Sequence, residues 1–156
     1  MNLISPILKV LLVAATPISE LRGSIPLALG AYHFTIWKAF FYSVLGNMIP
    51  VIFILWFLDP LSKFLIARFK IADKFFTWLF ERTRKNNAEK FGRWGDLALA
   101  IFVAIPLPMT GAWSGAVAAY VFGIPYKRAL LAILGGVIGA GIIVTLTYTG
   151  AVSLFF

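Results

Sequence analysis

Residues 17–26, with the sequence PISELRGSIP, place Glu20 and Arg22 inside a membrane-length apolar stretch. A charge near the bilayer centre costs roughly 2.5–3.5 kcal/mol even on mild insertion scales, so such residues usually mark a substrate or ion pathway. The two flanking prolines and Gly23 also exclude a smooth spanning helix. We therefore expect a broken helix, in which Glu20 and Arg22 either line a pathway or form a structural ion pair.

The composition of the whole chain indicates an integral membrane protein. It has 156 residues, of which 61% are hydrophobic, and its mean hydropathy is +0.92. We expect one membrane domain over residues 1–156. The sequence contains no cysteine, which excludes disulfides, thiolate catalysis and Cys-ligated metals. The net charge of +8 lies mainly in a membrane-flanking segment, so membrane lipids with anionic headgroups are the expected partners, and nucleic acid is not.

Four apolar regions organise the chain: residues 3–31, 36–58, 97–126 and 129–154. The second and fourth regions are long enough to be transmembrane helices, since about 20 helical residues span a bilayer. The first and third are too long for one span and too short for two. We predict that each forms a re-entrant hairpin, with one long kinked helix as the alternative. The residues expected to break these hairpins are Pro17, Pro26, Pro106 and Pro108.

The central segment, residues 59–95, differs from its neighbours because basic and aromatic residues alternate along it. Asp59 followed by Pro60 is a good helix start, so we predict an amphipathic helical segment in the membrane interface. If both hairpins are re-entrant, eleven of the 14 Lys and Arg residues lie on the same face of the membrane as this segment. That face should be cytoplasmic, which puts both termini on the outer side of a multi-pass inner-membrane protein.

An internal repeat relates the two halves of the chain. Five identical pairs are each separated by 89 residues: Pro17/Pro106, Lys38/Lys127, Leu45/Leu134, Gly46/Gly135 and Ile49/Ile138. One spanning helix separates the predicted hairpins, so they should enter the membrane from opposite sides. The predicted fold class is an all-α integral membrane protein with an inverted repeat. Each repeat contains a re-entrant helical hairpin and a transmembrane helix, and an amphipathic helical segment lies between the repeats.

The two breaks are expected to form a binding site. Half-helix N-termini favour anions, and the planar donor group of Arg22 matches phosphate or carboxylate. In an apolar site Glu20 can take up and release a proton. Asn47, at the centre of the second region, either lines the pathway or bonds to a neighbouring helix. The candidate substrate- and proton-binding residues are Ser19, Glu20, Arg22, Gly23, Asn47, Thr110 and Gly111.

Patterns typical of intramembrane enzymes are missing from the sequence. Residues 112–115, AWSG, lack the glycine two positions before Ser114 that a G-x-S-G protease motif needs. The sequence also has no H-E-x-x-H motif and no paired intramembrane aspartates. We therefore expect a protein that is not an enzyme and that has no cofactor or metal site.

Two segments carry a resemblance to a known family. Residues 20–27, ELRGSIPL, and 106–115, PLPMTGAWSG, resemble the two signature segments of the small multidrug export protein family, which is grouped with the DedA/VTT superfamily. The resemblance covers nearly the whole chain, although Met109 stands where glycine is expected. It implies two opposed re-entrant hairpins and the transport or transbilayer movement of lipids, including polyprenyl-phosphate carriers, often linked to the proton-motive force.

Three functional interpretations remain open at this point. The leading one is an inner-membrane transporter or lipid translocase that binds an anionic lipid or polyprenyl-phosphate-like substrate between the hairpins. Whether this transport is coupled to protons is left open by the sequence. The second is export of cationic drugs, with Glu20 as the binding charge. The third is a membrane scaffold in which Glu20 and Arg22 are purely structural. Assembly into a homodimer is a further open question.

Overall fold

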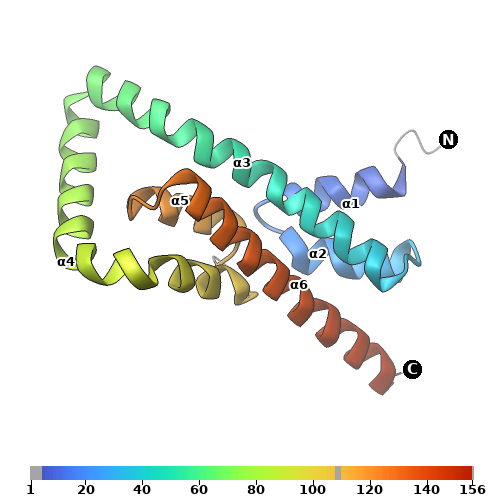
Figure 1. Ribbon diagram of the computed structural model, residues 1–156. Helices are drawn as coiled ribbons and strands as arrows, with labels where there is room; N and C mark the ends of the chain where they lie inside the picture. The colour runs from blue at the N-terminus through green and yellow to red at the C-terminus, as the bar shows by residue number, and fades with distance from the viewer. Residues whose placement is uncertain (1–4, 108–109, 156) are drawn as a thin grey trace.

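The computed structural model describes residues 5–107 and 110–155, except for the side chains of residues 80, 83–93 and 155. Every regular element in these ranges is a helix, as predicted (Figure 1). The elements are α1 (Pro6–Ala15), α2 (Glu20–Pro26), the π-helical turn η1 (Leu27–Ala31), α3 (Ile36–Arg68), α4 (Lys70–Ala104), α5 (Ala112–Val121) and α6 (Tyr126–Phe155).

Two of the described helices, α3 and α6, are long and apolar enough to cross a membrane. They include the predicted regions 36–58 and 129–154, but α3 does not end at residue 58. It has 33 residues and continues through Pro50 and Pro60 to Arg68. A proline removes one hydrogen bond and can kink a helix without ending it, so Asp59-Pro60 is not the helix start that we predicted.

Helix α4 merges two segments that the sequence analysis separates. The boundary before it lies at Phe69, whose backbone is extended, and α4 then runs for 35 residues to Ala104. It therefore contains most of the predicted segment 59–95 and also the first arm of the predicted region 97–126. Figure 1 shows that α4 changes direction along its length, so its last part returns to the middle of the molecule.

Each half of the chain contains a break between two helices. The first break, Thr16–Ser19, separates α1 from α2, and the second, Ile105–Gly111, separates α4 from α5. Helices α1 and α5 have ten residues each, which corresponds to about 15 Å, or half of a hydrocarbon core of about 30 Å. The two predicted breaks are therefore present.

Pro26 does not break the chain, which corrects one of the four predicted hairpin-break residues. It lies inside α2, and the helix continues from it into the wider turn η1. The Tyr32 N–H bonds to the Leu27 carbonyl, five residues earlier, at 3.3 Å. Proline leaves a helix carbonyl without its usual donor, and local widening is one way in which a helix accommodates this loss.

Glycines set the close contacts of α3 with α1 and of α6 with α4. A Cβ atom at Gly46 of α3 would lie 2.6 Å from the Leu11 carbonyl oxygen of α1. The corresponding contact in the second half is made by Gly136 of α6, whose Cβ would lie 2.6 Å from the Ala100 carbonyl oxygen of α4. A Cβ at Gly135 would meet nothing within 4 Å. The glycines that make these two contacts, Gly46 and Gly136, are thus 90 residues apart. The sequence repeat, with its constant spacing of 89 residues, pairs Gly46 with Gly135 instead.

The connections into the long helices show the same spacing. His33 precedes α3 with φ of +50°, and Gly123 precedes α6 with φ of +69°. These two residues are also 90 positions apart in the sequence. Glycine adopts positive φ at little cost, whereas a side-chain-bearing residue such as histidine does so uncommonly. A residue with positive φ therefore lies three positions before the start of each of these long helices.

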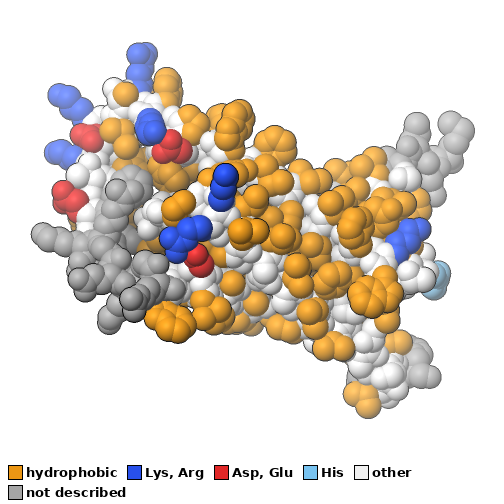
Figure 2. Space-filling model, in the orientation of Figure 1, with side chains coloured by type: hydrophobic (Ala, Val, Ile, Leu, Met, Phe, Trp, Pro, Cys, Tyr) orange, Lys and Arg blue, Asp and Glu red, His pale blue; other side chains and the backbone are white. Residues whose placement is uncertain are grey.

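The surface separates into an apolar middle and polar ends. In Figure 2, hydrophobic side chains cover the middle of the face shown, and most charged side chains gather near the α3–α4 end. The start of α1, the α2–α3 connection and the end of α6 lie toward the opposite end (Figure 1). Large apolar side chains on α3, including Trp37, Phe53 and Trp56, are more than 60% exposed, as expected for a lipid-facing surface.

Candidate functional site

Glu20 connects the two breaks. It is the first residue of α2, in the first half of the chain. Only 7% of its surface is exposed. Its Oε1 accepts a long hydrogen bond, at 3.5 Å, from the Trp113 backbone N–H at the start of α5. The N-terminus of a helix carries free N–H groups and partial positive charge, which suit a carboxylate. Glu20 thus caps a helix that begins 92 residues later in the chain.

The backbone at this contact is strained on both sides. Glu20 has φ of +44°, and Gly111 has φ of +155°. Such conformations cost on the order of 1–3 kcal/mol for residues with a side chain, and they occur most often at functional sites. A Cβ atom at Gly111 would also overlap the Glu20 carboxyl group. Glycine is therefore required at position 111 for its conformation and for its lack of a side chain.

Trp113 supplies a second link between the breaks. Its indole N–H donates to the Ala15 carbonyl oxygen, at the C-terminal end of α1, at 3.2 Å. The last carbonyls of a helix have no partner within that helix. The two breaks therefore complete one another: Glu20 of the first half caps α5, and Trp113 of the second half caps α1.

A small internal cavity lies beside these contacts. Its volume is about 10 Å³, which is at the lower limit for a single water molecule. Five of the seven predicted binding residues line it, together with Pro106 and six apolar residues: Glu20, Arg22, Asn47, Thr110, Gly111, Pro106, Leu21, Val103, Ala112, Val137, Ala140 and Val144. The structure thus brings together residues from α2, α3, α4, α5, α6 and the second break.

Asn47 gives this cavity an unsatisfied polar group. It is 1% exposed, and its Oδ1 atom has no hydrogen-bond partner among the described residues. Buried polar atoms are bonded in the great majority of cases, so one that faces a cavity indicates a position where a ligand, an ion or a water molecule can bind. Among the described residues, Asn47 therefore contributes an unpaired acceptor to the lining of this cavity.

Arg22 lies beside the cavity without a carboxylate partner. Within the described part of the chain, no Asp or Glu oxygen lies within 4.0 Å of its guanidinium group, Glu20 included. Its Nη2 contacts the Ile18 carbonyl oxygen at 3.5 Å, which is long for a hydrogen bond. The direct Glu20–Arg22 ion pair that a structural role would need is thus not formed in this conformation.

The other predicted residues stabilise the breaks. The Thr110 hydroxyl donates to the Ile105 carbonyl at 2.6 Å and accepts from the Leu107 N–H at 3.1 Å. Its hydrogen bonds are therefore made within the second break. Ser19 and Gly23 pack against each other outside the cavity lining, since a Cβ at Gly23 would lie 2.8 Å from the Ser19 Cβ. Pro17 is exposed in the first break, and Pro108 lies outside the described residues.

The sequence analysis did not assign a role to Trp113 or Ala15. Trp113 lies inside the second signature segment, and a tryptophan three residues after a Pro-rich turn could have indicated a polar contact for its indole N–H. Ala15 acts through its backbone carbonyl, which any residue type supplies. No side-chain pattern could therefore have identified it.

Two membrane-length helices and a largely apolar surface indicate a helical membrane protein. Residues 20–143 match the family described as "Putative small multi-drug export protein". Because this match covers most of the chain, the protein belongs to that family. No curated protein and no solved structure matches the chain with significance.

Proposed function

We propose that the protein is an inner-membrane carrier for an anionic lipid headgroup of the polyprenyl-phosphate type, with its substrate site at the two helix breaks. The observation that supports it is the meeting of Glu20, Arg22 and the unsatisfied Asn47 at one buried cavity. The family's description suggests export, but it names no lipid. The relation to the DedA/VTT superfamily is part of the same proposal.

The proposal places the two breaks at mid-membrane, as the tips of two re-entrant hairpins that enter from opposite faces. In its support, α1 and α5 are about half a membrane long, and their broken ends are joined by Glu20 and Trp113. Irregular backbone at membrane depth is tolerated where it is buried in protein or lines a cavity. Carriers with inverted repeats commonly bind substrates in this position.

In the proposed mechanism, the substrate anion replaces the Glu20 carboxylate at the start of α5. The cavity of about 10 Å³ cannot hold a phosphate together with Glu20, so Glu20 must move away first. Protonation removes the charge that the α5 N-terminus stabilises, which releases Glu20. The anion then binds the free N–H groups of α5 and the guanidinium group of Arg22.

This exchange makes binding depend on pH. In the described lining, Arg22 is the one other charged side chain, and α3, α4, α5 and α6 contribute uncharged residues. If the complex requires protonated Glu20, each bound anion is accompanied by one proton. Affinity should then fall as pH rises, by up to about tenfold per pH unit in the range where Glu20 titrates.

The test compares the binding of farnesyl phosphate and of farnesol to the purified protein at several pH values. Wild type should bind the phosphate but not the alcohol, with an affinity that falls as pH rises. Glu20→Gln should bind at all pH values, because glutamine has nearly the same shape and no titratable proton. Arg22→Gln should lose at least tenfold in affinity, whereas the exposed Lys38→Gln should match wild type as the control.

Three outcomes distinguish the interpretations. Equal affinity in wild type and Arg22→Gln would remove the anion site. Binding of a lipophilic cation that is lost in Glu20→Gln would support drug export instead. Unfolding of both variants, without a change in binding by the remaining folded protein, would support the scaffold interpretation.

A further inference from the structure

A second and much larger pocket lies between the end of α3 and the α5–α6 connection. Its volume is about 560 Å³, within the range typical of small-molecule sites. One carboxylate and three aromatic residues contribute to its lining, which consists of Leu55, Trp56, Asp59, Pro60, Tyr120, Gly123, Ile124 and Tyr126. This pocket shares no described lining residue with the small cavity at the two breaks.

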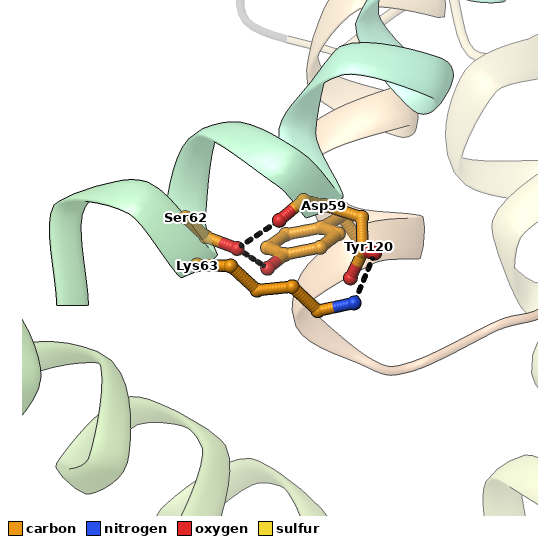
Figure 3. A network of polar contacts seen from close by, with 4 residues as sticks. All are labelled: Asp59, Ser62, Lys63 and Tyr120. Carbon is orange, nitrogen blue, oxygen red and sulfur yellow. Dashed lines mark hydrogen bonds and ion pairs between the residues drawn. The ribbon is translucent and has the colours of Figure 1, made fainter. Parts of the chain in front are cut away.

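Hydrogen bonds fix one wall of this pocket in place. The Ser62 hydroxyl of α3 bonds to the Tyr120 hydroxyl of α5, and it also donates to the Asp59 carbonyl oxygen at 2.9 Å (Figure 3). Ser62 is 3% exposed. The Tyr120 ring is therefore held beside Asp59 before any ligand binds, and this preorganisation reduces the entropy cost of binding.

The charges at the pocket suit a zwitterion. Asp59 Oδ2 accepts from Lys63 Nζ at 2.6 Å, and both side chains are more than half exposed. Such an exposed pair contributes little net stability, so a ligand can separate it readily. An ammonium group could then bind to Asp59 and the aromatic rings, while Lys63 turns to a phosphate on the same ligand. A simple cation would be repelled by Lys63, which is paired with Asp59.

The depth of the pocket matches that of lipid headgroups. Helix α3 is about 50 Å long, whereas a hydrocarbon core is about 30 Å thick. If the membrane span begins at Ile36, about 20 helical residues cross the hydrocarbon core and end at Leu55. Trp56 and Asp59 then lie at the membrane–water boundary. Tryptophan and tyrosine are enriched at this boundary, and the pocket contains Trp56, Tyr120 and Tyr126.

We propose that this pocket is a binding site for the headgroup of a resident zwitterionic phospholipid. Its ammonium group binds to Asp59 between Trp56 and Tyr120, and its phosphate binds to Lys63. The acyl chains extend along the exposed apolar side chains of α3, which include Phe53 and Phe57. This site is independent of the carrier cycle proposed above.

Native mass spectrometry of the purified protein with phosphatidylethanolamine or phosphatidylglycerol tests this proposal, because the two lipids can carry the same acyl chains. Wild type should bind phosphatidylethanolamine at least fivefold more tightly than phosphatidylglycerol. Asp59→Asn should abolish this preference, and Trp56→Leu should reduce it. The exposed Asp73→Asn, on α4 and away from the pocket lining, should retain it as the matched control.

A competition experiment with free ethanolamine distinguishes a site for a phospholipid headgroup from a site for a free small amine, since both ligands carry an ammonium group. Free ethanolamine should not displace the lipid at millimolar concentration, because it lacks the phosphate and the acyl chains. Displacement at that concentration would identify a site for small amines and overturn the lipid assignment. Equal binding of the two phospholipids by wild type, or an unchanged preference in folded Asp59→Asn, would overturn the proposal as a whole.

Discussion

At the scale of single residues, Trp113 contributes two donors to two different partners. Its backbone N–H contacts the Glu20 carboxyl group, and its indole N–H bonds to the Ala15 carbonyl. Phenylalanine at this position would keep the backbone contact and most of the ring. The indole contribution can therefore be measured separately from the capping of α5.

We expect Trp113→Phe to lower the free energy of unfolding by about 1–2 kcal/mol, because the Ala15 carbonyl loses its donor in an apolar environment. Trp37→Phe is the matched control, since Trp37 is 83% exposed. Thermal unfolding of both variants in the same detergent provides the measurement. An equal effect of the two substitutions would mean that the indole bond does not contribute to stability.

The residue scale also shows what a sequence can reveal about a site. Glu20, Arg22 and Asn47 were identified because polar side chains are costly in apolar segments, and all three line one cavity. The use of the Thr110 hydroxyl inside its own turn could not be predicted, because it depends on the local path of the backbone. The same applies to the positive φ of Glu20, for which the sequence gives no signal.

At the scale of elements, adjacent glycines in α6 have different roles. Gly136 faces α4, where a Cβ atom would lie 2.6 Å from a backbone oxygen, whereas a Cβ at Gly135 would meet nothing within 4 Å. Small residues allow close approach of helices in membranes, where packing replaces the hydrophobic effect as the main source of association. The contact of α4 with α6 therefore depends on one glycine of the pair.

Gly136→Ala should destabilise the protein by about 1–3 kcal/mol, as expected for overpacking, and Gly135→Ala should leave its stability unchanged or slightly increased. Chemical unfolding in mixed micelles can compare the two variants directly, and each contains the same added methyl group. A larger effect of Gly135→Ala would restore the 89-residue correspondence between the halves and contradict the packing described here.

Helix boundaries were the least predictable features of the elements. The presence of helical segments on both sides of each break followed from apolar runs and prolines. Pro26 and Pro60 nevertheless lie inside helices, because a proline shows where a helix loses a hydrogen bond and does not show whether the neighbouring turns continue it. The junction at Phe69, by contrast, has no glycine or proline beside it, so no local residue signalled it.

At the scale of the whole molecule, the arrangement in Figure 1 makes the topology testable. The absence of native cysteine allows single cysteines to be introduced at exposed positions. We expect Thr35→Cys and Ser153→Cys to react with an impermeant maleimide in right-side-out membrane vesicles. Lys70→Cys and Lys127→Cys should react only after permeabilisation, because the basic segment is predicted to face the cytoplasm.

A reaction of positions 70 and 127 from opposite sides would contradict the opposed re-entrant hairpins. Reaction of all four positions in the reverse pattern would keep the hairpins and invert the predicted orientation. Permeabilised vesicles serve as the control for each cysteine, since they show that the thiol is reactive when the reagent can reach it.

The reciprocal capping at the two breaks has a consequence for the inheritance of the two halves. A half-length chain that carried only residues of the first half would leave the Ala15 carbonyl without its donor, and the second half alone would leave the α5 N–H groups without their acceptor. Each buried group that is left unsatisfied costs about 1–3 kcal/mol. A loss of the Glu20 carboxylate or the Trp113 indole in one half therefore leaves a backbone group of the other half without its partner, which means that the two halves can change only as a matched pair.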